Sequence, residues 1–108
     1  MNFEGAVDKQ LRTVRELLIR KNAAYGNSAL EPCRIFSGAS PSEQIKVRID
    51  DKLSRIANSR HRAPAEVEDT VLDLIGYLVL LRISEEEDVN QWFGTQQTLP
   101  FSVPDLTL

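Results

Sequence analysis

Apolar residues recur at the spacing of an α-helix in three segments of this chain. The first segment runs from about Glu4 to Ala24, the second follows Ser40, and the third runs from near Pro64 to Ile83. Spacings of three and four residues place such positions on one face of a helix, so three helices are predicted. The three apolar stripes consist of Phe3, Val7, Leu11, Val14 and Leu18, then Ile45, Ile49, Leu53 and Ile56, then Val67, Val71, Leu74, Leu78 and Leu81.

Capping residues indicate where these helices begin and end. Ser40-Pro41-Ser42-Glu43 has serine at the N-cap, proline at the first helical position and glutamate at the third, which is a capping box. Gly26 suits the C-terminal cap of the first helix. A second capping box, Ser84-Glu85-Glu86-Glu87, predicts either a kink or a short fourth helix that reaches about Phe93 and closes at Gly94.

The segments between and within the helices carry further expectations. Residues 26–39 are predicted to form a loop that Ile35 and Phe36 anchor in the core, and residues 58–63 a polar break. A glycine inside a helix costs about 1 kcal/mol relative to alanine. We therefore expect a neighbouring element to pack closely against Gly76 in the third helix.

These patterns predict an all-α fold. One helical domain is expected over residues 1–94, with three main helices and a short fourth in an antiparallel bundle. A domain of this size buries a modest core, so we expect oligomerisation to complete the bundle. Beyond Leu74 the third helix is apolar on nearly every side, as in a central or interface helix. Residues 95–108 include two prolines and predict an extended arm that docks on the protein or, alternatively, a frayed tail.

Composition narrows the class of protein. The 108 residues are 42% hydrophobic and 27% charged, as in an ordinary globular domain, and the net charge of -3 argues against a general nucleic-acid binder. Cys33 and His61 are the single residues of their types, so neither a disulfide within the chain nor a multi-histidine metal site is expected. The N-terminus has no signal-peptide pattern, and residues 74–81 are too short to span a bilayer. We therefore expect a cytoplasmic protein without membrane contact.

Carboxylates on two of the predicted helices form a candidate metal site. Asp69 and Asp73 are four residues apart and share a helix face. With Asp50 or Asp51 from the second helix, they would supply the oxygen ligands that Mg²⁺ prefers. Further candidate ligands are Glu66 and Glu68.

Basic residues lie among these carboxylates. Lys52 and Arg55 are within one helical turn of Asp51, and a mixed acidic and basic site suits a metal together with a polyphosphate. Two alternatives remain open: the carboxylates form ordinary ion pairs, such as Asp51 with Arg55 or Asp69 with Lys52, or the basic residues only make the surface soluble. The other basic residues near these positions are Arg34, Lys46, Arg48, Arg60 and Arg62.

The end of the first helix contains a second candidate site. In Lys21-Asn22-Ala23-Ala24-Tyr25-Gly26-Asn27-Ser28, Tyr25 could stack on a base, Asn27 could bond a base edge and Lys21 could meet a phosphate. The alternative is a capped helix end whose tyrosine packs onto the core.

Three motifs in order resemble the nucleotide modification associated domain family of phages and prophages. The motifs are residues 21–28, 47–55 and 68–77. That family looks related to the MazG-type nucleoside triphosphate pyrophosphatases, which are all-α dimers or tetramers that bind Mg²⁺ through acidic pairs on two helices. The resemblance implies a nucleotide-binding homo-oligomer of a bacterial or phage-infected cell. Asp73 matches the MazG-type aspartate before an apolar helix, whereas Thr70 stands where its glutamate partner is usual.

Two functions are compared on this basis. The first is a Mg²⁺-dependent nucleoside triphosphate pyrophosphohydrolase. The alternative is a protein that sequesters a nucleotide without turnover, including a cyclic or ADP-ribose-derived defence signal; a purely structural helical module is a third possibility. In the enzyme, Asp51, Asp69 and Asp73 would hold the metal, Glu68 would assist or orient water, Lys21, Lys52 and Arg55 would contact phosphates, and Tyr25 and Asn27 would contact the base.

Overall fold

The computed structural model describes residues 1–61 and 63–95, apart from the side chains of His61, Ala65, Glu66, Glu68 and residues 89–95. Within these residues the fold is all-α, as predicted, and contains no strand. Its elements are α1 (Phe3–Tyr25), α2 (Pro41–Ala57), the short 3₁₀ helix η1 (Ser59–His61) and α3 (Pro64–Thr95).

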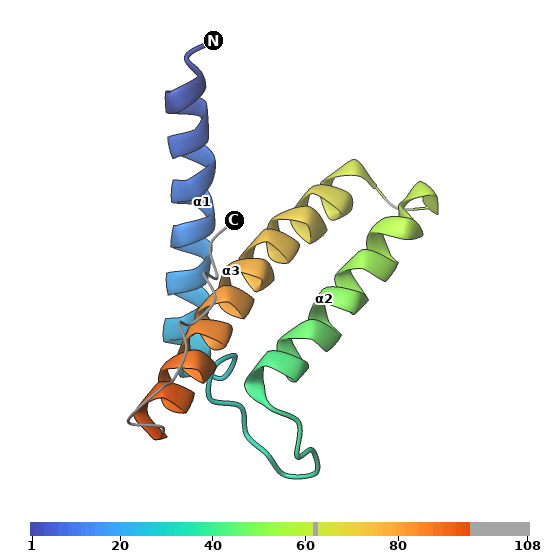
Figure 1. Ribbon diagram of the computed structural model, residues 1–108. Coiled ribbons are helices and arrows are strands. Elements are labelled where there is room, and N and C mark those ends of the chain that lie inside the picture. The colour runs from blue at the N-terminus through green and yellow to red at the C-terminus, as the bar shows by residue number, and fades with distance from the viewer. Residues whose placement is uncertain (62, 96–108) are drawn as a thin grey trace.

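The helices α2 and α3 form the main packing unit. They lie side by side in opposite directions, joined by η1 (Figure 1). The helix α1 meets α3 near its own C-terminal end, and its N-terminal half projects past α3 (Figure 1). The antiparallel pairing of α2 and α3 is therefore present, whereas completion of a bundle by further copies stays a prediction.

Local capping explains the ends of α1 and α2. Ser40 is the N-cap of α2, and its hydroxyl accepts a hydrogen bond from the Glu43 backbone N–H at 3.2 Å. Gly26 ends α1 in the left-handed region at φ 62° and ψ 43°, and its N–H donates to the Asn22 carbonyl. Both predicted caps are confirmed, because each depends on residues close together in the sequence.

The predicted fourth helix is instead the C-terminal part of α3, which continues without a break to Thr95. The hydroxyl of Ser84 is buried and lies 2.9 Å from the hydroxyl of Ser42 on α2. Because the Ser84 hydroxyl bonds to a residue of α2, it does not cap a helix that begins at residue 84. The capping-box pattern at residues 84–87 therefore does not mark the start of a new helix. The predicted extended arm lies outside the described residues beyond Thr95.

The predicted loop is present at residues 26–40, but its anchor is wrong. The side chain of Ile35 is 76% exposed and that of Phe36 is fully exposed. Both residues therefore lie outside the core, on the loop that runs from the C-terminal end of α1 to the start of α2 (Figure 1). The buried apolar side chains among the described residues are Val14, Leu17 and Ile45.

Gly76 fulfils the expectation of a close neighbour. A Cβ at this position would lie 3.2 Å from Cδ2 of Leu18, so the absent side chain lets α1 approach α3. This contact fixes where α1 crosses α3, and the candidate site lies beside it. None of the described helices combines the length and the apolar character needed to cross a lipid bilayer.

Candidate functional site

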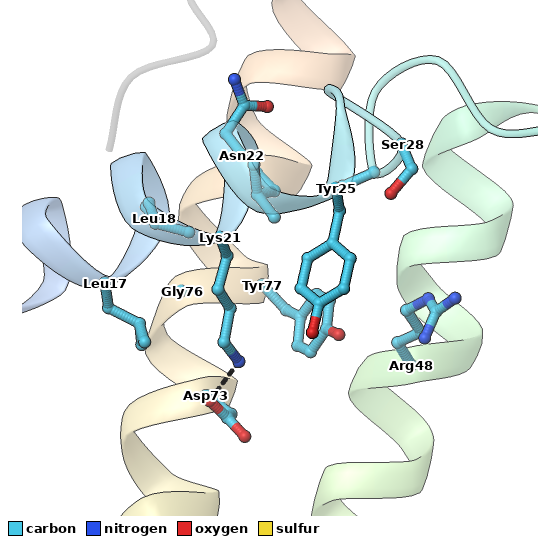
Figure 2. Close-up of a pocket in the computed structure, with 12 residues that line it drawn as sticks. Leu17, Leu18, Lys21, Asn22, Tyr25, Ser28, Arg48, Asp73, Gly76 and Tyr77 are labelled. Atoms are coloured by element: carbon cyan, nitrogen blue, oxygen red, sulfur yellow. Dashed lines mark hydrogen bonds and ion pairs between the residues drawn. The ribbon is translucent and has the colours of Figure 1, made fainter.

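A cavity of about 370 Å³ lies between the C-terminal end of α1, the middle of α3 and α2 (Figure 2). Its polar lining comes from all three helices and from the loop after α1. Its floor is apolar where α1 crosses α3. The lining residues are Leu17, Leu18, Lys21, Asn22, Tyr25, Ser28, Ala29, Arg48, Asp73, Gly76, Tyr77 and Leu80.

Helical spacing explains how these side chains reach one place. On α1, Lys21 and Tyr25 are four residues apart and therefore share a face. On α3, Asp73 and Tyr77 are also four residues apart and share the face that meets α1. Figure 2 shows Lys21 of α1 directed toward Asp73, with Arg48 on the opposite wall.

The carboxylate of Asp73 is shared by two lysines from two different helices. Nζ of Lys21 lies 3.0 Å from its Oδ1, and Nζ of Lys52 lies 3.7 Å from its Oδ2. The side chain of Lys52 is 14% exposed and that of Asp73 is 25% exposed. Salt screens such partly buried charges less than it screens surface charges. Lys21, which is 46% exposed, lines the cavity, whereas Lys52 reaches the same carboxylate from α2 without lining the cavity. The carboxylate thus brings the two ammonium groups to one place beside the cavity.

Two tyrosines add aromatic surface to the same cavity. Tyr25 is 68% exposed, so much of its ring is open to a ligand. Nζ of Lys52 lies 6.0 Å from the centroid of the Tyr77 ring, at the outer limit of a cation–π contact. The cavity thus joins cationic groups to aromatic faces, which is the chemistry that a base linked to a phosphate would use.

The structure brings together four of the predicted site residues. Lys21, Tyr25 and Asp73 line the cavity, and Lys52 reaches Asp73 from α2. Asn27 lies in sequence between the lining residues Tyr25 and Ser28 but does not line the cavity. It has φ 62°, and its carbonyl oxygen accepts hydrogen bonds from the backbone N–H groups of Leu30 and Glu31.

Other predicted site residues lie elsewhere. Nε of Arg55 pairs with Oδ2 of Asp51 at 3.3 Å, one helical turn away, and both side chains are about half exposed. This contact is the ion pair that the sequence offered as an alternative to a ligand site. Asp69 is exposed one turn before Asp73 and does not line the cavity. The side chain of Glu68 lies outside the described residues.

The described side chains place two of the predicted magnesium ligands in ion pairs. Among the described side chains, no three histidine, cysteine, aspartate or glutamate residues gather in a way that could hold a metal ion. Asp73 binds two lysines, and Asp51 binds Arg55. The Mg²⁺ prediction stays a prediction, since two further candidate ligands, Glu66 and Glu68, have side chains outside the described part.

Sequence reasoning left several lining residues without a role. Tyr77 lies within the third motif but had no predicted role, and Arg48 was named only among the basic residues near the candidate site. The signal was helical spacing, because Tyr77 is four residues after Asp73 and Arg48 is four residues before Lys52. Asn22 and Ser28 also line the cavity from the ends of the first motif.

Comparisons with protein-family models, curated proteins and solved structures find no match to this chain.

Proposed function

We propose that this cavity binds a nucleotide directly through protein cations, without turnover. The observation that carries the proposal is the meeting of Lys21 and Lys52 at Asp73, beside the open ring of Tyr25. Lysines at such a point neutralise a phosphate, and an exposed tyrosine stacks on a base. The protein then belongs to the sequestering class rather than the hydrolytic one.

The carboxylate of Asp73 has a positioning role in this proposal. It draws Lys21 from α1 and Lys52 from α2 to one place before a ligand arrives, so less side-chain entropy is lost on binding. A phosphate then forms charge-assisted hydrogen bonds with the two ammonium groups and with Arg48, which lines the α2 wall.

The order of the three motifs supports the wider setting. Their resemblance to the phage and prophage family supports a nucleotide ligand and the cytoplasm of a bacterial or phage-infected cell as the place of action.

A homo-oligomer is part of the proposal. The first three stripe residues of α1, Phe3, Val7 and Leu11, are exposed. The Cα radius of gyration is 16.9 Å, above the roughly 13 Å of a compact 100-residue domain. A second copy that covers the apolar face of α1 would bury these side chains and complete a helical bundle.

The test is isothermal titration calorimetry with a panel of ribonucleotides and deoxynucleotides in excess EDTA. Binding should persist in the chelator, and Lys21→Met should weaken it about tenfold or more, because a hydrogen bond between charged groups is lost. Lys46→Met is the matched control, since Lys46 pairs with Glu43 on the surface of α2, away from the cavity. Equal affinities of the two variants would contradict the proposal.

The same panel separates sequestration from hydrolysis. Each nucleotide is incubated with Mg²⁺ or Mn²⁺ and the products are separated by chromatography. The proposal expects unchanged nucleotide. Turnover that Asp73→Ala abolishes would replace it with the pyrophosphohydrolase.

A further inference from the structure

The charges around the cavity set a limit on the charge of its ligand. Lys21, Arg48 and Asp73 line the cavity, and Lys52 contacts Asp73 from α2 without lining it. Together these three cations and one carboxylate have a net charge of +2. The remaining lining residues are uncharged. A ligand with about two negative charges is therefore matched by the cavity without a metal ion.

The position of these charges is more specific than their sum. The ammonium groups of Lys21 and Lys52 lie 3.0 Å and 3.7 Å from the two oxygens of one carboxylate, so their charge converges on one small region. A terminal phosphomonoester carries a charge of about -1.5 to -2 on one phosphorus at pH 7. A phosphodiester carries a single negative charge and satisfies one of the two lysines electrostatically.

The carboxylate of Asp73 acts against longer phosphate chains. Each added phosphoryl group brings further negative charge toward a wall that already holds Asp73, and like charges at short range are unfavourable. The cavity volume of about 370 Å³ lies at the lower end of the range of about 300–1,000 Å³ for small-molecule pockets. Both features favour a small ligand with one terminal phosphate.

We infer that the ligand class is a nucleoside monophosphate with a free terminal phosphate, held at Lys21 and Lys52. This inference rests on the proposed function and specifies the ligand of the same site. Cyclic nucleotides, with their diester linkage, and nucleoside di- and triphosphates bind less tightly when no metal ion is present.

The experiment is calorimetric titration of the full chain in excess EDTA with adenosine, AMP, 3′,5′-cyclic AMP, ADP and ATP, and with the corresponding series of guanine and a pyrimidine. For the preferred base, the monophosphate should bind at least about tenfold tighter than the nucleoside and the cyclic monophosphate, and tighter than the di- and triphosphate. A nucleoside, cyclic nucleotide or triphosphate that binds as tightly as the monophosphate overturns the inference but leaves nucleotide binding standing. Absence of binding by every compound overturns the proposed function as well.

Asp73→Asn tests the charge argument in the same assay. Removal of the negative charge raises the net charge of the cavity to about +3, so the preference for AMP over ADP should fall about tenfold. Lys46→Met is titrated in parallel and should keep the wild-type preference, because Lys46 does not line the cavity. An unchanged preference in a folded Asp73→Asn variant, verified by circular dichroism, would overturn the assignment of charge matching at this site.

Discussion

A single carboxylate, Asp73, shows how the environment of a residue decides its chemistry. The same side chain suits a metal ion when other carboxylates are near and suits two lysines when they are near. In this structure it lies 3.0 Å from Nζ of Lys21 and 3.7 Å from Nζ of Lys52, and its role as a magnesium ligand stays a prediction. The spacing of Asp69 and Asp73 along α3 could not distinguish these two environments, because Lys21 is 52 residues away in sequence.

The left-handed residue at the end of α1 gives the residue-scale prediction. Gly26→Ala places a Cβ on a backbone with φ 62°, where an L-residue costs about 1–2 kcal/mol. We expect a loss of about 1 kcal/mol in the free energy of unfolding, measured by urea denaturation. Gly38→Ala is the matched control, since it lies in the same loop with open space around its Cβ position and no positive φ.

An equal effect of the two glycine substitutions would show that the αL backbone at position 26 does not stabilise the fold. The comparison is informative because both glycines have open space at the Cβ position. Backbone conformation is the difference between them.

At the scale of elements, a buried polar contact joins α2 to α3. The hydroxyl of Ser42 donates to Oδ2 of Asp88 at 2.9 Å, so its proton is engaged and Ser84 is the donor in the 2.9 Å contact between the two hydroxyls. Both serines are buried. Hydroxyl groups in this position are satisfied only when α2 and α3 keep one register.

Because Ser84 donates to Ser42 and Ser42 donates to Asp88, replacing the two serines should lower the free energy of unfolding by different amounts. Ser42→Ala leaves the buried hydroxyl of Ser84 without this partner and should cost about 1–3 kcal/mol, whereas Ser84→Ala leaves Ser42 bonded to Asp88 and should cost less. The double variant should be less destabilised than the sum of the single variants, because the two hydroxyls share one interaction.

Urea denaturation of the three variants measures these differences in unfolding free energy. Ser54→Ala, on the exposed surface of α2, serves as a control for the loss of a serine hydroxyl. Equal costs for Ser42→Ala and Ser84→Ala would contradict the donor assignment.

The elements also show what the sequence could predict. The helix positions and the caps at Ser40 and Gly26 depend on interactions between residues within about one helical turn. They were therefore predicted correctly from the sequence. The pattern at Ser84 has the same local form as the one at Ser40, but the Ser84 hydroxyl bonds to Ser42 of α2 and does not serve as a helix cap. The placement of Phe36 failed for a related reason, since apolar character alone does not say whether a helix lies within reach.

In the candidate site, too, the residues predicted from local motifs differ from those that depend on packing between helices. Lys21, Tyr25 and Asp73 were found because each belongs to a short motif, and helical spacing brings them to the cavity. The roles of Arg48 and the pairing of Lys52 with Asp73 depend on how α1 and α2 lie against α3. Such packing involves residues far apart in sequence and is not encoded in local spacing.

At the scale of the molecule, the apolar stripe of α1 is longer than the surface that α3 covers. Val14 and Leu17 are buried, whereas Phe3, Val7 and Leu11 are exposed on the projecting half (Figure 1). Exposed contiguous apolar surface of this kind is typical of a protein interaction site.

Leu11→Glu tests whether a second copy covers this stripe. Wild-type protein should elute as a dimer or tetramer in size-exclusion chromatography with light scattering, and Leu11→Glu should shift it toward the monomer, because a buried charge is costly at an interface. Val47→Glu is the control, since Val47 is an exposed apolar residue of α2 and lies off this stripe. A wild-type monomer, or a shift with Val47→Glu alone, would contradict the proposed assembly.

α1 crosses α3 at Gly76, beside the cavity, so a tilt of α1 about this crossing would move its N-terminal end. Because α1 rises about 1.5 Å per residue, Phe3 lies about 22 Å from the crossing at Leu18, and a small tilt there moves the far end by several ångströms. A ligand held at Lys21 and an oligomer partner held at Phe3 would both act on this one rigid rod. If binding of one tilts the helix and changes the affinity for the other, thermodynamic reciprocity requires the two factors to be equal. Dissociation constants for the oligomer with and without AMP measure that factor, and identical values would show that the two sites are not coupled.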